Sequence, residues 1–268
     1  MHMEDAEDME DARLDAEAAA PAQTAQPAQP AQQPKLKVFL FVLCHDDASE
    51  ACARQDWDVP WARVVRLENT LPMSVFREGA AFLGAIKDSE AEWRDADFVG
   101  SVSWKARQKI GLRPEHVLEA CLAASGGAAD VVALYPYGRN LLEHTAACLP
   151  RFQDAWVRCL GAVGHDAADT AGPKAHDMPY FVCNYWLASP AWMASYIAWL
   201  ERLAHAMLTT PEVQDVLWAD TRYATGLEPS RLLELYGRPY LPHHGFITER
   251  TPCFFFWHNG ARIHMNRR

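Results

Sequence analysis

The chain has 268 residues, a formal net charge of −10 and a hydrophobic content of 50%. Eight acidic residues against one Arg give residues 1–34 a charge of −7, so residues 35–268 hold only −3. A nearly neutral domain offers no basic face, and we expect no nucleic-acid partner.

Residues 1–34 are acidic and rich in Ala, Gln and Pro. Such a segment has too little apolar surface to offset the entropy of ordering, so we expect a disordered tail. Residues 35–268 are enough for one folded domain.

The seven cysteines are scattered, odd in number and without the spacing of a zinc site. Reduced thiols in a cytoplasmic protein are the simplest interpretation. We see no signal peptide and no run of about 18 apolar residues, so we expect no membrane span.

The first half of the chain alternates apolar runs with helical patterns. Lys37–Leu43 is predicted to be a strand, residues 48–70 a loop with short turns, Leu71–Asp88 a helix and Asp97–Ser103 a second strand. A helix is expected from Pro114 to Ala124, because Pro is favoured at the first turn.

The middle of the chain continues this alternation. We predict a strand over residues 130–135, helical segments over 140–149 and 151–160, and a polar loop over 161–179. A buried strand over 180–187 follows.

The last third is mostly helical. Helices are predicted over residues 189–208, 211–221 and 229–236, and residues 238–249 lead into the aromatic segment Phe254–Trp257. The alternation as a whole predicts an α/β fold with a mostly parallel, Rossmann-like central sheet flanked by helices.

His45, Asp46 and Asp47 directly follow the first predicted strand. Ligands of open α/β sheets bind at the carboxyl ends of strands, so these residues could border a nucleotide. The two carboxylates could also hold a divalent metal such as Mn or Mg. Equally, either Asp could cap the next segment.

Lys105, Arg107 and Lys109 follow the strand that ends at Ser103. Three cations in five residues could neutralise a diphosphate through charge-assisted hydrogen bonds. The alternative is a solvated basic face.

Asn184 and Trp186 interrupt an apolar run. A buried Asn must be hydrogen-bonded, and a Trp face can stack on a sugar ring. The alternative is core packing.

His243, His244, Glu249 and Arg250 form the densest titratable cluster. His244 or Glu249 could act as a general base, and Arg250 could bind phosphate or pair with Glu249. The spacing matches no zinc signature, and the alternative is a structural ion pair at a helix start.

The order of these segments resembles the glycosyltransferase-like family with a GT-A type fold known as domain of unknown function 4422. The resemblance covers roughly residues 36–258 and rests on Glu68-Asn-Thr-Leu71, Asp97-Phe-Val-Gly-Ser-Val-Ser-Trp-Lys105 and Gly245-Phe-Ile-Thr-Glu-Arg250. The last segment matches the family's Gly-Phe-x-x-Glu-Arg. Ser103 stands where the family usually has His.

The resemblance implies a glycosyltransferase that moves a sugar from a nucleotide-sugar donor to a glycan or other hydroxyl acceptor. His45, Asp46 and Asp47 would border the donor nucleotide. Lys105 and Arg107 would bind the leaving diphosphate.

Asn184 and Trp186 would shape the sugar pocket, and Glu249 or His244 would be the base or orient the acceptor. Two other hypotheses stay open: a non-catalytic binding or scaffold protein on the same fold, and a metal-dependent hydrolase.

Overall fold

The computed structural model describes residues 36–67 and 70–266. The predicted disordered tail, residues 1–34, and Glu68 and Asn69 of the resemblance lie outside the described residues.

The described residues build a six-stranded sheet with the strand order β2-β1-β3-β5-β4-β6. Its strands are β1 (Val38–Cys44), β2 (Ala62–Arg66), β3 (Phe98–Ser103), β4 (Val131–Ala133), β5 (Trp186–Ala188) and β6 (Ile263–Met265). β1 pairs in parallel with β2 and β3, and β4 pairs in parallel with β6.

β5 runs antiparallel to both of its neighbours, β3 and β4. The α/β class is therefore confirmed, and the sheet is mixed and not purely parallel: β5 is antiparallel, while the other five strands run in one direction. The reversed direction of β5 was not predicted, because a continuous apolar run indicates burial on both faces of a sheet and not the direction of the strand.

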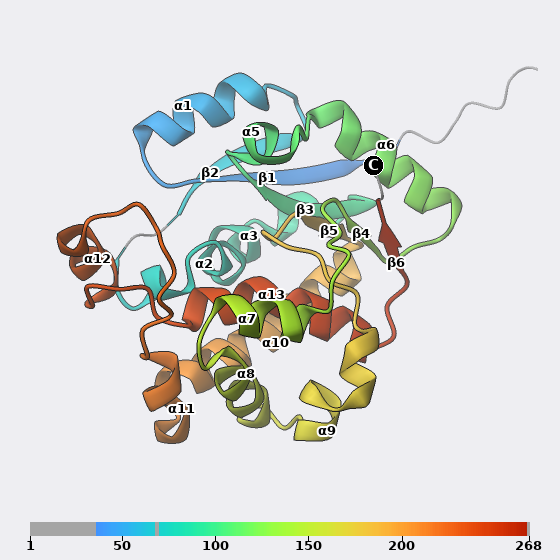
Figure 1. Ribbon diagram of the computed structural model, residues 1–268. Coiled ribbons are helices and arrows are strands. Elements are labelled where there is room, and N and C mark those ends of the chain that lie inside the picture. Colours follow the sequence, from blue (N-terminus) through green and yellow to red (C-terminus); the bar gives the residue numbers. More distant parts are fainter. Residues whose placement is uncertain (1–35, 68–69, 267–268) are drawn as a thin grey trace, which may run out of the picture. The chain divides into compact units, whose positions relative to one another are not determined.

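Helices cover both faces of the sheet (Figure 1). On one face lie α1 (Asp47–Asp56), α5 (Ala106–Ile110) and α6 (Pro114–Gly126); on the other lie α2 (Gly79–Leu83), α10 (Pro190–Thr209) and α13 (His244–His258). Successive residues of β1 alternate between two cores, with Leu40 and Val42 in one and Phe41 and Leu43 in the other. This alternation follows from the two-residue period of a strand.

The shorter elements complete the chain. They are η1 (Met73–Phe76), α3 (Ala85–Asp88), α4 (Glu90–Trp93), α7 (Leu141–Cys148), α8 (Phe152–Gly161), α9 (Ala167–Ala171), η2 (Pro173–Asp177), α11 (Pro211–Leu217) and α12 (Pro229–Tyr236). No helix of the described ranges is both long and apolar enough to cross a membrane.

The predicted loop over residues 48–70 is wrong, because it contains α1 and β2. In α1 only Ser49 and Ala53 are buried, so the helix has no apolar stripe that a sequence pattern could reveal. Its start is instead fixed by Asp46, whose side chain accepts a hydrogen bond from the Ser49 amide. The predicted loop over residues 161–179 likewise holds α9 and η2.

The predicted helix over residues 71–88 is broken into η1, α2 and α3. The first break is at Arg77, a non-glycine residue in the left-handed region with φ 54°. The break turns the chain and places Glu78 immediately before α2.

Only the end of the predicted strand over residues 180–187 is a strand. Cys183 (φ 66°) and Asn184 (φ 54°) both have positive φ, outside the β region, and β5 begins only at Trp186. At the other end of the chain, the aromatic segment Phe254–Trp257 belongs to α13 and continues the helix of Glu249 and Arg250.

Candidate functional site

Two carboxylates meet near the carboxyl ends of β1 and β3. Glu249 Oε1 accepts a hydrogen bond from the backbone amide of Cys183 at 3.0 Å. Glu78 Oε2 lies 3.5 Å from Asn184 Nδ2. We call Arg77, Glu78, Lys109, Asn184 and Glu249 the carboxylate cluster.

Two glycines allow the helices that carry these carboxylates to approach closely. A Cβ on Gly79 would lie 2.6 Å from Thr248 Oγ1, and a Cβ on Gly245 would lie 2.6 Å from Arg77 Cδ. Arg77 and Gly79, on either side of Glu78, therefore pack closely against the first turns of α13. This contact brings Glu78 beside Glu249, although the two residues are far apart in the sequence.

The pKa values of the two carboxylates are shifted in opposite directions. Burial and then the charge of Glu249 raise the pKa of Glu78 to about 7. Burial would also raise the pKa of Glu249, but Arg250, Arg77, the Cys183 amide and Lys109 together lower it. Glu249 is therefore an ionised acceptor, and Glu78 can gain or lose a proton near neutral pH.

Cations surround the pair. Arg250 Nη1 lies 3.3 Å from Glu249 Oε2, and its Nε donates to Thr145 Oγ1 at 2.9 Å. Arg77 lies over the Phe246 ring, 5.6 Å from its centroid. Lys109 Nζ donates to Cys183 Sγ at 2.7 Å. Burial lowers the pKa of Lys109, but the effects of Cys183, Glu249 and Glu78 are larger and raise it overall.

The Glu249 side chain keeps 20% of its surface exposed, whereas Arg250 behind it keeps 11%. The cluster is thus sheltered but reachable from solvent. Such a setting strengthens electrostatic interactions and still admits a ligand.

Asn184 is fixed beside the pair and is only 2% exposed. The backbone carbonyl oxygen of Asn184 accepts a hydrogen bond from Ser101 Oγ of β3 at 2.9 Å. The next residue, Tyr185, shares a hydrogen bond of 2.6 Å with Ser103, the last residue of β3. The end of β3 therefore positions Asn184.

His45 and Lys105 lie at the ends of the two parallel strands. Burial, followed by the positive charges of Arg77 and Lys105, lowers the pKa of His45, while Asp46 opposes them. His45 thus borders the carboxylate cluster through Arg77. Lys105 is exposed, with its Nζ 4.8 Å from the Trp104 ring centroid.

Asp46 and Asp47 have structural partners. Asp46 caps α1 through the Ser49 amide at 2.8 Å, and Asp47 is 95% exposed and paired with Arg66. Within residues 36–67 and 70–266 no group of three or more His, Cys, Asp or Glu side chains could hold a metal ion. The Mn or Mg site predicted at these two residues does not fit their geometry, and we derive no step through a metal.

Arg107 and Trp186 are not in the cluster. Arg107 pairs with Asp56 of α1 at 2.6 Å, and this ion pair occupies its guanidinium. Trp186 is fully buried and stacked on Phe82 at a centroid distance of 5.1 Å, so its faces are not available to a sugar ring.

His244 is also a core residue, which argues against its predicted role as a base. Its ring is fully buried beside Trp218 and Phe76, and neither ring nitrogen has a hydrogen-bond partner. Burial lowers the pKa of His244 to about 3. A neutral imidazole without access to solvent cannot exchange a proton with a substrate.

Sequence reasoning missed Glu78 and Arg77 and gave Lys109 no separate role. The signal was an Arg-Glu-Gly break inside the apolar run from Met73 to Leu83. An acid in the middle of a buried segment must find a partner, and a following glycine permits a close approach.

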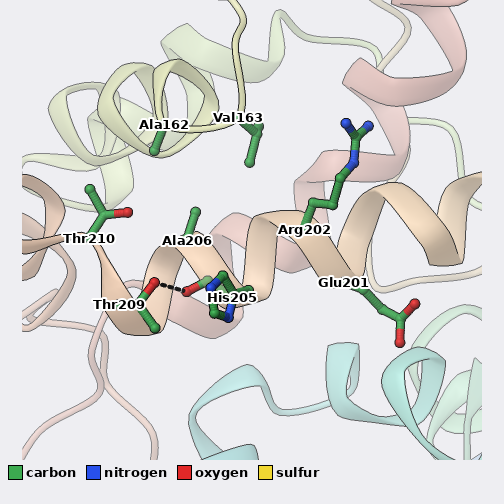
Figure 2. A pocket seen from close by; sticks show the side chains of 8 residues that line it. All are labelled: Ala162, Val163, Glu201, Arg202, His205, Ala206, Thr209 and Thr210. Carbon is green, nitrogen blue, oxygen red and sulfur yellow. Dashed lines mark hydrogen bonds between the residues drawn. The ribbon is translucent and has the colours of Figure 1, made fainter.

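A hollow of about 680 Å³ lies between the end of α8 and α10. Figure 2 shows its lining, in which Thr209 Oγ1 donates to the carbonyl oxygen of His205 at 2.8 Å. The carboxylate of Glu201 is paired with Lys87. None of the lining residues belongs to the carboxylate cluster, so we assign the hollow no part in its chemistry.

Comparison of the chain with known protein families, with curated proteins and with solved structures found no match.

Proposed function

We propose that this protein is a glycosyltransferase with a GT-A-like fold, which moves a sugar from a nucleotide-sugar donor to the hydroxyl of a glycan or other acceptor. The observation that carries the proposal is the pair of sheltered carboxylates with divergent pKa values, Glu78 and Glu249, near the ends of two parallel strands. Carboxylates with divergent pKa values suit acid–base chemistry.

Transfer to an acceptor requires that its hydroxyl lose a proton. A general base works best when its pKa is near the operating pH, and the pKa of Glu78 is raised to about 7. We assign the proton to a Glu78 carboxylate oxygen. Glu249 stays ionised and orients the acceptor, which keeps one of the two roles predicted for it from the sequence.

The leaving nucleoside diphosphate gains negative charge as the sugar–oxygen bond breaks. Arg77, Lys105 and Lys109 would supply positive charge there, beside His45. Preorganised cations are worth most where charge develops in the transition state. Lys109 thus takes the place that the sequence hypothesis gave to Arg107.

A turnover screen tests the proposal. UDP-, GDP-, CMP- and dTDP-sugars are each supplied with a mixed glycan acceptor, with and without manganese, and the released nucleotide is measured. We expect release with one donor class, and a loss of at least about 100-fold in Glu78→Gln, the range in which general-base catalysis contributes.

Glu115→Gln, an exposed carboxylate of α6, is the matched control and should retain full activity. Thermal stabilisation by a nucleotide sugar without any turnover would instead favour the non-catalytic binding protein. Hydrolysis that requires manganese and proceeds when no nucleotide-sugar donor is supplied would favour the hydrolase.

A further inference from the structure

The guanidinium of Arg250 is a buried cation that the protein binds from several sides. Its side chain is only 11% exposed. Nη1 donates to the carbonyl oxygen of Phe246 at 3.1 Å and lies 3.3 Å from Glu249 Oε2. Nε donates to Thr145 Oγ1 at 2.9 Å, and the Phe152 ring centroid lies 5.6 Å from Cζ. These contacts occupy Nε and Nη1 inside the protein, so a structural ion pair describes Arg250 better than a phosphate contact does.

The hydrogen bond to Thr145 differs from the other two, because it joins Arg250 to another helix. Phe246 and Glu249 belong to α13 like Arg250 itself, so they fix the guanidinium only relative to its own helix. Thr145 is a fully buried residue in the middle of α7. A hydrogen bond with an ionised donor is about twice as strong as one between neutral groups. Thr145 therefore ties the charged end of Arg250 to α7.

Tyr180 lies against the same two groups. It is 2% exposed, and its hydroxyl lies 3.3 Å from Nδ1 of His144, the residue of α7 that precedes Thr145. Burial raises the pKa of Tyr180, whereas Arg250 and a hydrogen bond with Thr145 lower it. The segment before β5 thus supports the contact between α7 and Arg250.

The place of Arg250 matters because Glu249 is buried beside a second carboxylate of the cluster. Burial raises the pKa of Glu249, and the charge of Arg250 is the largest of the effects that lower it. Three further groups lower it less: Arg77, the Cys183 amide and Lys109. Since the attraction between opposite charges falls with distance, a displaced Arg250 would leave Glu249 less well compensated.

We propose that Thr145 is a positioning residue for the proposed reaction: its hydroxyl, supported by Tyr180, fixes Arg250 as the counter-ion of Glu249. Thr145 has no exposed surface and acts only through Arg250. The inference rests on the proposed function, which gives Glu249 the task of orienting the acceptor. It adds α7, an element without a role in the site until now.

Three variants isolate the hydroxyl. Thr145→Val removes it and keeps the shape of the side chain, whereas Thr145→Ser keeps it. Thr170→Val is the matched control, because Thr170 is also a fully buried helical threonine and its hydroxyl donates to the Asp166 carbonyl oxygen at 3.0 Å in α9. Circular dichroism and the melting temperature establish that each is folded. Should Thr145→Val fail to fold, Tyr180→Phe replaces it with the same expectations.

The first measurement needs no substrate. Nitrogen NMR follows the Arg250 Nε–H signal, which is assigned by its loss in Arg250→Lys. In Thr145→Val the exchange of this hydrogen with solvent should be about 10- to 100-fold faster, the range for one hydrogen bond to a charged group. Thr145→Ser and Thr170→Val should exchange it as the wild type does.

The second measurement is the pH dependence of turnover with the active nucleotide-sugar donor. In Thr145→Val, kcat should fall by up to about 100-fold, the loss that follows when a group is misplaced by about 1 Å, while KM changes little. The acidic limb of the kcat profile should move to higher pH, because a weaker counter-ion raises the pKa of Glu249. Thr145→Ser should restore both, and Thr170→Val should alter neither.

The outcomes separate the inference from the proposed function. Unchanged exchange in Thr145→Val, or faster exchange with a wild-type kcat and pH profile, would overturn the inference and leave the transferase intact. A serine variant as impaired as the valine variant would also overturn it, since the hydroxyl would then not be the cause. Faster exchange in Thr145→Val, in a protein whose wild type turns over no donor, would overturn the transferase and keep Thr145 as the anchor of Arg250.

Discussion

At the scale of single residues, the candidate site depends on charges that shift one another. The charge of Glu249 is one cause of the raised pKa of Glu78, second only to burial. Glu249 itself remains ionised because Arg250, Arg77 and the Cys183 amide favour its charged form. The protonation of Glu78 is therefore set partly by its neighbour, and a change at one residue should be measurable at the other.

The variant Glu249→Gln should lower the pKa of Glu78, because a like charge nearby disfavours ionisation and the amide removes that charge. The midpoint of the Glu78 side-chain carboxyl resonance, followed by carbon NMR between pH 4 and 9, measures the shift. Glu115→Gln should leave the midpoint in place. An unchanged midpoint in Glu249→Gln would show that burial alone raises the pKa.

The residues of this site were only partly predictable from the sequence. Glu249 and Asn184 stand out as polar groups beside apolar or aromatic runs, and both lie in the cluster. Glu78 does not, because its significance comes from a break in a helix and a contact with a distant segment. His244 was predicted from its residue type and its place in a dense titratable cluster, and its burial excludes it from the site.

At the scale of elements, the contact between β3 and β5 depends on Gly100. A Cβ at this position would lie 2.0 Å from the carbonyl oxygen of Trp186 and 2.5 Å from Leu187 Cα. Both are backbone atoms of β5, so a side-chain rotation cannot relieve the clash. The close pairing carries the segment of Cys183 and Asn184 to the end of β3.

Gly100→Ala should destabilise the fold by about 1–3 kcal/mol or more, the range for overpacking a well-packed core. Gly126→Ala, at the last residue of α6, is the matched control. An added Cβ meets nothing within 4 Å there, so it should be neutral or stabilise by about 0.5–1 kcal/mol. Urea unfolding of both variants measures the difference, and equal stability of the two would contradict the role of Gly100.

Elements with local signals were predicted well. The helices that begin at Pro114, Pro190 and Pro229 each carry Pro in the first turn, and all three are confirmed. The direction of β5 could not be predicted, since it is set by the path of the chain and not by composition. The polar helix α1 was missed because it buries almost no apolar surface.

At the scale of the whole molecule, two adjacent buried histidines link stability to pH. Burial lowers the pKa of His243 to about 4 and that of His244 to about 3. The unfolded chain binds protons at these residues below about pH 6.5, whereas the folded chain does not. Stability should therefore fall as the pH falls from 6.5 toward 4, by up to about 1.4 kcal/mol per pH unit for each histidine.

Glu78 acts in the opposite direction, because its folded pKa is raised. Burial also lowers the pKa values of His45, His144 and His165, which therefore act in the same direction as His243 and His244. His244→Phe should flatten the loss by up to about 1.4 kcal/mol per pH unit, which urea titrations at pH 7, 6 and 5 would measure. His205→Gln, a change at an exposed histidine, should not alter the slope. A slope in His244→Phe as steep as that of the wild type would exclude His244 as its source.

The polar contacts that define the carboxylate cluster join distant parts of the chain. Asn184 and Glu78 are separated by 106 positions, and Cys183 and Glu249 by 66. Contacts of such long range form only once the intervening loops have closed. The carboxylate cluster therefore cannot form within one local segment of the chain. A fragment that lacked either α2 or α13 could keep its remaining helices, but it would hold only one of the two carboxylates and none of the contacts between them.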